Sequence, residues 1–299
     1  MTFHFQKVTV LGSGTMGHGI AQVCARAGIA TVLYDVDLSS VDTGFRMIRE
    51  NLDAEVAADE LSQTERDNTL GRLQRSSDLA LAVQGAHLII EVAPESMDIK
   101  RGLFRLLEQR VGEDTVFATN AASLSVSELS QGMDHPERFL GLHFSNPVHE
   151  IELVEVVRGD QTSEITRESV VEFVEEIGKH PILVRDSPGF ASSRLGVLVC
   201  MEAIRMVETS VTSPGDIDNA MVLSHEHPIG PLRLADLIGL DVQMDAASRL
   251  HEALGSETFR PPKLLERMVA EGKLGKKTGE GFYKWDEDHT QEAEAPDAN

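Results

Sequence analysis

The stretch KVTVLGSGTMGHGIAQVCARAG, residues 7–28, decides the fold of this chain. Residues 7–11 form an apolar run typical of a buried strand, and residues 16–27 place apolar side chains at helical spacing. Between these two patterns, Gly12, Gly14 and Gly17 complete the motif G-x-G-x-x-G. A strand before this motif and a helix after it form the arrangement that binds a dinucleotide. The alternative for the motif alone is a glycine-rich structural turn.

Each glycine of the motif has a physical task in that arrangement. Gly12 permits a tight turn, Gly14 lets the backbone approach a pyrophosphate, and Gly17 allows the helix to pack against the strand. The N-terminus of the helix offers free N–H groups and the positive end of its dipole to the phosphates. We therefore expect the loop, including Thr15 and Met16, to bind the cofactor.

Asp35 closes the next apolar run and lies 18 residues after Gly17. A carboxylate at this position accepts hydrogen bonds from an adenosine ribose and repels a 2′-phosphate. Residues 36–40 contain no arginine or lysine that would bind such a phosphate. The expected cofactor is therefore NAD rather than NADP. Asp35 can also cap the following helix, and the two roles are compatible.

Short apolar runs alternate with helical patterns up to about residue 186, which predicts an α/β fold with a Rossmann-like, doubly wound, mostly parallel sheet. The expected strands are residues 7–11, 31–34, 88–92, 116–119, 139–144, 151–157 and 182–184. The expected helices are residues 16–27, 38–53, 99–111, 125–131 and 163–177. The polar residues 54–77 are predicted to be helical or hairpin-like.

After residue 189 the chain shows only helical patterns, which predicts a separate all-α domain. These helices are expected at residues 193–208, 216–223, 232–254 and 262–271, with a structured turn over 272–285. The predicted domains are residues 1–186 for NAD binding, 187–285 for the helical part and 286–299 for an acidic disordered tail.

The composition excludes several classes of protein. The 299 residues suffice for about two domains. No apolar run approaches the roughly 20 residues that span a bilayer, and the N-terminus lacks the pattern of a secretory signal. The formal net charge of −22 argues against nucleic acid as a partner. Such an acidic composition suits either a halophilic source or an ordinary acidic enzyme.

Two further residue pairs bear on localisation and on metals. Cys24 and Cys200 lie far apart in separate helical patterns, which predicts two reduced thiols in a cytoplasmic protein. His225 and His227 are two residues apart and do not share a helix face. No third ligand accompanies these histidines in the sequence, so we expect no metal site.

His143 lies near the carboxyl end of the expected strand 139–144, at the edge where open parallel sheets bind ligands. A histidine suits proton transfer at neutral pH. The next expected strand carries Glu152 and Glu155 on opposite faces. A carboxylate on such an apolar strand needs a partner, and an imidazole would serve. The spacing does not choose between the two glutamates, and an arginine is an alternative partner for either.

An ordered series of segments resembles the 3-hydroxyacyl-CoA dehydrogenases, including 3-hydroxybutyryl-CoA dehydrogenases, over about residues 6–285. The segments are LGSGTMGHGIAQVCARAG, LIIEVAPES, RFLGLHFSNP, LVEVV, GKHPILVRDSPGF, HPIGPLRLAD and GKKTGEGFYKW. The resemblance implies NAD-dependent oxidation of a short-chain L-3-hydroxyacyl-CoA, or the reverse reduction, in fatty-acid metabolism. It also implies a homodimer formed through the helical domain, which contacts substrate, and no membrane partner.

The resemblance further assigns roles to individual residues. It makes His143 the base and Glu155, not Glu152, its partner, and it places Asn146 near the reacting centre. The residues that it assigns to the cofactor, beyond the glycine loop and Asp35, are Glu95, Lys100 and Asn120. The residues that it assigns to the substrate are Ser123, Ser193 and Asn146.

The chain departs from the family pattern on the substrate side. The family usually has Asn-Thr-Ser-Ser-Leu where residues 120–124 read NAASL, so Ala122 replaces a serine that meets substrate and nicotinamide. Ser193 stands where the family has asparagine, and residues 51–60 contain acids but no base. Two alternatives follow. One is the same chemistry on a carrier-protein thioester or a free small hydroxy acid, and the other is a non-catalytic NAD-binding protein.

Overall fold

The computed structural model describes residues 3–285 and 290–292 of the chain. It divides into two compact units between Phe190 and Ala191, four residues beyond the domain boundary expected at 186. No described helix is long and apolar enough to cross a bilayer.

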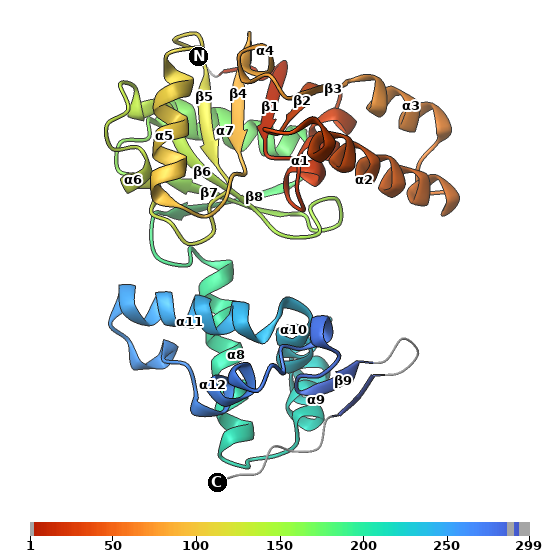
Figure 1. Ribbon diagram of the computed structural model, residues 1–299, viewed down its shortest axis with the longest axis vertical. Coiled ribbons are helices and arrows are strands. Elements are labelled where there is room, and N and C mark those ends of the chain that lie inside the picture. Colours follow the sequence, from red (N-terminus) through yellow and green to blue (C-terminus); the bar gives the residue numbers. More distant parts are fainter. Residues whose placement is uncertain (1–2, 286–289, 293–299) are drawn as a thin grey trace. The chain divides into compact units, whose positions relative to one another are not determined.

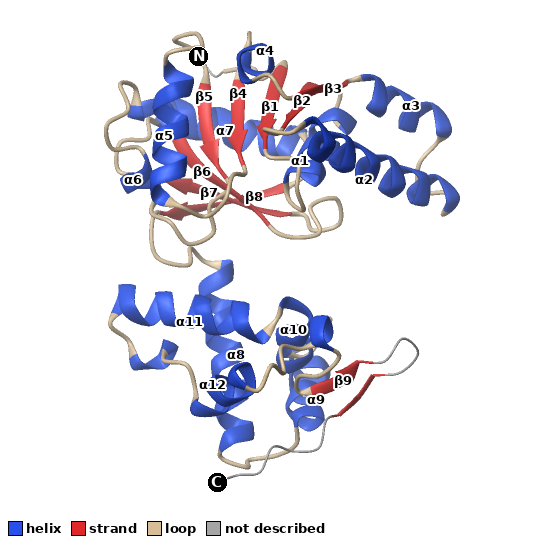
Figure 2. Ribbon diagram, viewed as in Figure 1, coloured by secondary structure: helices blue, strands red, loops and turns tan. Residues whose placement is uncertain are grey.

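Among residues 3–190, eight strands form one sheet in the order β3-β2-β1-β4-β5-β6-β7-β8 (Figure 2). The strands are β1 (Lys7–Leu11), β2 (Ala30–Tyr34), β3 (Leu73–Ser76), β4 (Leu88–Glu91), β5 (Val116–Thr119), β6 (Phe139–Phe144), β7 (Leu153–Arg158) and β8 (His180–Arg185). All neighbours run parallel except β6 and β7. The predicted doubly wound, mostly parallel sheet is confirmed.

Helices cover both faces of this sheet, and Figure 1 shows α5 on one face and α7 on the other. The helices of the first unit are α1 (Gly17–Arg26), α2 (Leu38–Ala57), α3 (Gln63–Gly71), α4 (Leu79–Val83), α5 (Met97–Glu108), α6 (Val126–Leu129) and α7 (Glu164–Glu176). A short 3-10 turn, η1 (Pro136–Arg138), precedes β6.

The central strands are continuous apolar runs because each side of the sheet has its own core. In β4, Leu88 and Ile90 are buried in the same apolar cluster as Ile20 of α1. Ile89, between them, is buried in a second cluster with Phe104 of α5. Side chains alternate between the two faces of a strand, so a doubly covered strand must be apolar at every position.

The winding of the sheet reverses between β1 and β4. From β1 the chain adds β2 and β3 on one side, then crosses back and adds β4, β5 and β6 on the other. Because these strands are parallel, their carboxyl ends lie at one edge of the sheet. Such a reversal point is where open α/β sheets bind ligands.

The prediction for residues 54–77 was incomplete. The helical part is present as the end of α2 and as α3, but residues 73–76 form the edge strand β3. Thr31 of β2 is the register partner of Leu73. Only Leu73 of the four residues LQRS is buried, so this strand carries no apolar pattern that would reveal it.

The second unit is mainly helical, as predicted. Its helices are α8 (Ser192–Glu208), α9 (Pro214–His225), α10 (Pro231–Ile238), α11 (Leu240–Leu254) and α12 (Lys263–Ala270), with the 3-10 turns η2 (Glu257–Phe259) and η3 (Lys276–Thr278). Its core includes Met201, Ile204, Leu232, Leu265 and Phe282. One departure from the expected all-α unit is β9 (Tyr283–Trp285), at the end of the turn predicted over 272–285, which pairs antiparallel with β10 (Thr290–Glu292).

Two further predictions about this unit need correction. The single helix expected over 232–254 is two helices, because Gly239 adopts φ +110° and ends α10. Of the tail expected to be disordered, residues 290–292 form β10, and residues 286–289 and 293–299 lie outside the described residues.

A buried carboxylate fixes the glycine-rich segment that precedes the tail. Asp236 of α10 is 1% exposed and accepts hydrogen bonds from the backbone N–H groups of Phe282 and Tyr283. It also accepts one from Nε1 of Trp285. Burial raises the pKa of Asp236 above its usual range. Residues 279–285 (GEGFYKW) therefore have a structural role, because their bonds to Asp236 hold the segment against α10.

Each unit contains one buried free cysteine. Cys24 lies in α1 and Cys200 in α8, and neither forms a disulfide. Burial raises the pKa of each thiol to about 12. Both side chains are therefore neutral thiols at physiological pH.

Candidate active site

The glycine loop between β1 and α1 has the conformation that its sequence requires. Gly12 has φ +115°, and a β carbon there would lie 2.8 Å from the carbonyl oxygen of Val92. A β carbon on Gly17 would lie 1.7 Å from the carbonyl oxygen of Gly12. Gly14 is exposed, with no atom within 4 Å of the place its β carbon would take. The loop thus leaves open space at the N-terminus of α1, which fits a pyrophosphate.

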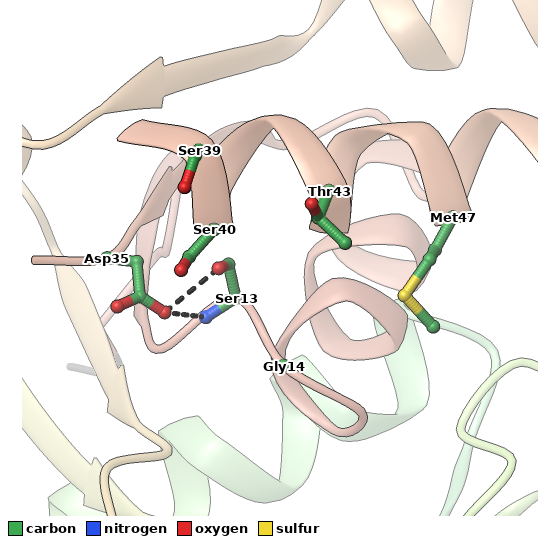
Figure 3. A pocket seen from close by; sticks show the side chains of 7 residues that line it. All are labelled: Ser13, Gly14, Asp35, Ser39, Ser40, Thr43 and Met47. Carbon is green, nitrogen blue, oxygen red and sulfur yellow. Dashed lines mark hydrogen bonds between the residues drawn. The ribbon is translucent and has the colours of Figure 1, made fainter. Parts of the chain in front are cut away.

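A cavity of about 270 Å³ lies beside this loop, between the end of β2 and the start of α2 (Figure 3). Its lining residues are Ser13, Gly14, Asp35, Ser39, Ser40, Thr43 and Met47. Hydroxyl groups and one carboxylate line this cavity, and none of its lining residues is a cation. These groups fit a ribose better than a ribose phosphate, which agrees with the expected preference for NAD.

His143 and Glu155 are directly opposite each other in the antiparallel pair β6–β7. Nδ1 of His143 lies 2.8 Å from Oε2 of Glu155. The Glu155 side chain is 1% exposed and the His143 side chain 12%. The sheet register therefore selects Glu155 as the partner, whereas Glu152 precedes β7. With Nδ1 held by the carboxylate, Nε2 is available for proton transfer.

Replacement of Glu155 by glutamine is expected to lower kcat at least about tenfold while the fold is kept. Glutamine has nearly the same size but lacks the negative charge that fixes the Nδ1–H tautomer of His143 and balances an imidazolium. Steady-state kinetics and circular dichroism of the variant check this prediction. A kcat within twofold of the unmodified enzyme would contradict the role of Glu155.

A buried ion pair lies at the carboxyl end of β4. The Glu91 side chain is fully buried, and the Lys100 side chain, on α5, is 1% exposed. Nζ of Lys100 lies 2.6 Å from Oε1 of Glu91 and also donates to the carbonyl oxygen of Ala93. Oε2 of Glu91 accepts from the Thr119 hydroxyl of β5. Lys100 therefore faces inward, and its evident contribution is to hold the loop after β4.

Glu95 connects this ion pair to the loop after β5. Its Oε2 lies 3.6 Å from Nζ of Lys100. Its Oε1 accepts hydrogen bonds from the N–H groups of Ala122 and Ser123 and from the Ser123 hydroxyl. Two loops that the resemblance assigned to cofactor and substrate are thus joined by one carboxylate.

The remaining expected site residues lie at different places. Oδ1 of Asn120 accepts the N–H of Phe144, which fixes the loop after β5 against the strand of His143. Asn146 is exposed on the loop after β6. Ser193 lies in the first turn of α8, in the second unit. The roles of these residues stay predictions.

Sequence reasoning missed two residues that support the site. Glu91 stands in the buried run LIIE, and a carboxylate in such a run signals a buried partner. Ser13 occupies a variable position of the glycine motif, and its sequence gives no sign of the contact that it makes with Asp35.

Known proteins resemble this chain along nearly its whole length. The family model "3-hydroxyacyl-CoA dehydrogenase, NAD binding domain" matches residues 7–187, and the model of the family's C-terminal domain matches residues 189–285. A probable 3-hydroxybutyryl-CoA dehydrogenase of Deinococcus radiodurans is 40% identical over 279 residues, which cover 93% of this chain and all of that protein.

A human protein and a solved bacterial structure are also similar to this chain. The human mitochondrial hydroxyacyl-coenzyme A dehydrogenase is 39% identical, covering 94% of this chain and 91% of that protein. The crystal structure of an (S)-3-hydroxybutyryl-CoA dehydrogenase from Ralstonia eutropha has a TM-score of 0.91 at 36% identity, covering 95% of this chain and all of that one. The chain therefore belongs to the family of NAD-dependent 3-hydroxyacyl-CoA dehydrogenases.

Proposed function

We propose that this chain oxidises the 3-hydroxyl group of an L-3-hydroxyacyl-CoA to a 3-oxo group with NAD, and catalyses the reverse reduction. The observation that carries the proposal is the His143–Glu155 pair at the carboxyl edge of the sheet, the edge that also carries the glycine loop and Asp35. Family membership supports both the cofactor and the reaction class.

His143 and Glu155 have different roles in the proposed proton transfer. Nε2 of His143 removes the proton of the 3-hydroxyl group, and Glu155 stabilises the imidazolium that results. NAD⁺, when bound, supplies the acceptor for the hydride that leaves C3. In the reverse direction the His143 imidazolium returns its proton to the alcohol oxygen. Asn146 and Ser123 are proposed to orient the thioester and the hydroxyl group, and Ser193 to contact the substrate.

The substrate is proposed to be a short-chain acyl-CoA such as 3-hydroxybutyryl-CoA. The names of the relatives from Deinococcus and Ralstonia support this choice. Ala122, which lacks the hydroxyl group usual in the family, favours a second candidate in which a carrier-protein thioester or a free hydroxy acid takes the place of the CoA ester. The reaction at C3 is the same in both cases.

Formation of NADH from three substrates tests these proposals. L-3-Hydroxybutyryl-CoA is expected to react with a far higher kcat/KM than free 3-hydroxybutyrate or the pantetheine thioester that imitates a carrier protein. A preference for either of the latter would overturn CoA recognition and leave the chemistry intact. Tight NADH binding without turnover of any of the three would instead favour a non-catalytic role.

The helical unit is proposed to form a homodimer in the cytoplasm. Exposed apolar side chains on α10 support this proposal, because Leu234, Leu237 and Ile238 are 40–45% exposed and share one helix face. The buried free thiols of Cys24 and Cys200 support a reducing compartment.

Replacement of Leu237 by aspartate is expected to convert the dimer into a monomer, because a charge on this face would have to lose its water in the interface. Light scattering coupled to size-exclusion chromatography measures the mass. The matched control is Leu81→Asp on α4, which changes an equally apolar, 64% exposed residue of the other unit and is expected to stay dimeric. A dimeric Leu237→Asp variant would exclude this face.

A further inference from the structure

Ser13 places two hydrogen-bond donors on one oxygen of Asp35. The backbone N–H of Ser13 lies 2.8 Å from Oδ2 of Asp35, and the Ser13 hydroxyl lies 2.9 Å from the same atom. The other oxygen, Oδ1, accepts the N–H of Val36 at 2.8 Å. Figure 3 shows both Ser13 bonds at the end of the cavity beside the glycine loop. Three donors thus determine the orientation of this carboxylate.

The Ser13 side chain has little freedom to adopt another position. Ser13 is 2% exposed. Helix α2 packs closely over it at Gly44, where a β carbon would lie 2.5 Å from the Ser13 carbonyl oxygen and 3.1 Å from its β carbon. The hydroxyl group is therefore confined between the glycine loop and α2, and its observed partner is Asp35.

We propose that the Ser13 hydroxyl group is a specificity-determining, positioning group that holds Asp35 in the orientation that accepts a ribose hydroxyl and excludes a 2′-phosphate. A carboxylate has about four acceptor positions, so three donors leave capacity for a ribose hydroxyl. A carboxylate that is held in place cannot turn aside for a phosphate. The inference rests on the use of NAD in the proposed function, and it adds a residue that acts through Asp35.

Replacement of Ser13 by alanine tests the inference, since it removes the hydroxyl group and keeps the backbone donor. Dissociation constants of NADH and NADPH are measured by nicotinamide fluorescence, without an acyl substrate. The NADH constant is expected to rise about tenfold, as for the loss of one charge-assisted hydrogen bond. The NADPH constant is expected to stay unchanged or to fall, because an Asp35 that has lost this bond can turn aside for the 2′-phosphate, so the preference for NADH falls at least about tenfold.

Two comparisons separate this role from a merely structural one. Ser62→Ala removes another serine hydroxyl that bonds to a carboxylate, that of Glu65 at the start of α3, and is expected to leave both dissociation constants unchanged. In an Asp35→Ala background, Ser13→Ala is expected to have no further effect on NADH binding, because the group through which it acts is gone.

Three results would overturn the inference. They are an NADH constant for Ser13→Ala within twofold of the unmodified enzyme, equal losses for NADH and NADPH, or a full effect of Ser13→Ala in the Asp35→Ala background. A failure of the proposed function gives a different result, in which the unmodified enzyme binds NADH but does not oxidise a 3-hydroxyacyl-CoA.

Discussion

Replacement of His143 by alanine is expected to lower kcat about a hundredfold to ten-thousandfold, the range for the loss of a general base. The imidazole is held through Nδ1 by Glu155, and its removal takes away Nε2, the atom proposed to accept the proton of the 3-hydroxyl group. Steady-state kinetics with L-3-hydroxybutyryl-CoA measures the change. The dissociation constant of NADH is expected to stay nearly constant, because the glycine loop and the Asp35 cavity are unaltered.

A second histidine–glutamate pair provides the control for this variant. Nδ1 of His135 lies 3.1 Å from Oε1 of Glu137, and both side chains are 48% exposed. His135→Ala removes the same chemical group from the surface of the same unit and is expected to keep kcat. If His143→Ala retained more than a third of the turnover of the unmodified enzyme, His143 would not be the base.

Replacement of Lys100 by methionine is expected to lower the free energy of unfolding by about 3–5 kcal/mol at neutral pH. Methionine fills much of the space of the lysine side chain but leaves the carboxylate of Glu91 buried without its cation. The loop after β4 also loses the bond from Nζ to the carbonyl oxygen of Ala93. Denaturant unfolding followed by circular dichroism measures the loss.

The pH dependence of this variant follows from Glu91. Burial already raises the pKa of Glu91 above its usual range, and Lys100 opposes that rise. Without Lys100 the folded protein binds a proton at Glu91 still more tightly than the unfolded chain does. The stability of the variant therefore falls as the pH rises through this raised pKa. We expect its deficit to be largest at neutral pH and to shrink as the pH falls and Glu91 takes up a proton.

Two variants complete this test. Lys277→Met removes the cation of an exposed pair with Asp241 and is expected to cost less than about 1 kcal/mol. Glu91→Gln combined with Lys100→Met removes both charges and is expected to recover part of the loss. A loss below about 1 kcal/mol for Lys100→Met alone would show that the buried pair contributes little.

The sequence was sufficient for features that short segments determine. The glycine loop, the strand of His143 and the central strands β1, β4 and β5 follow from apolar runs and turn residues that are adjacent in the chain. The edge strand β3 could not be found in this way. It is held by backbone bonds to β2, and three of its four residues carry no burial signal.

The partners of His143 and Lys100 are set by contacts between segments that are distant in the sequence, so residue spacing alone did not predict them. The sequence alone does not show which of Glu152 and Glu155 contacts His143. The antiparallel register of β6 and β7 places Glu155 opposite His143. The inward orientation of Lys100 depends on Glu91, and a buried pair between a strand and a helix leaves no periodic pattern. Tertiary packing therefore supplies the information on partners, while local sequence supplies the elements.

The reactivity of the two buried thiols can be used to follow the unfolding of each unit. A thiol reagent needs a thiolate, and the raised pKa values of Cys24 and Cys200 keep both sulfurs unreactive while the surrounding helices are intact. The denaturant concentration at which Cys24 becomes alkylated therefore reports the unfolding of α1, and that for Cys200 reports the unfolding of α8. Peptide mass spectrometry after such labelling would reveal which of the two units unfolds first.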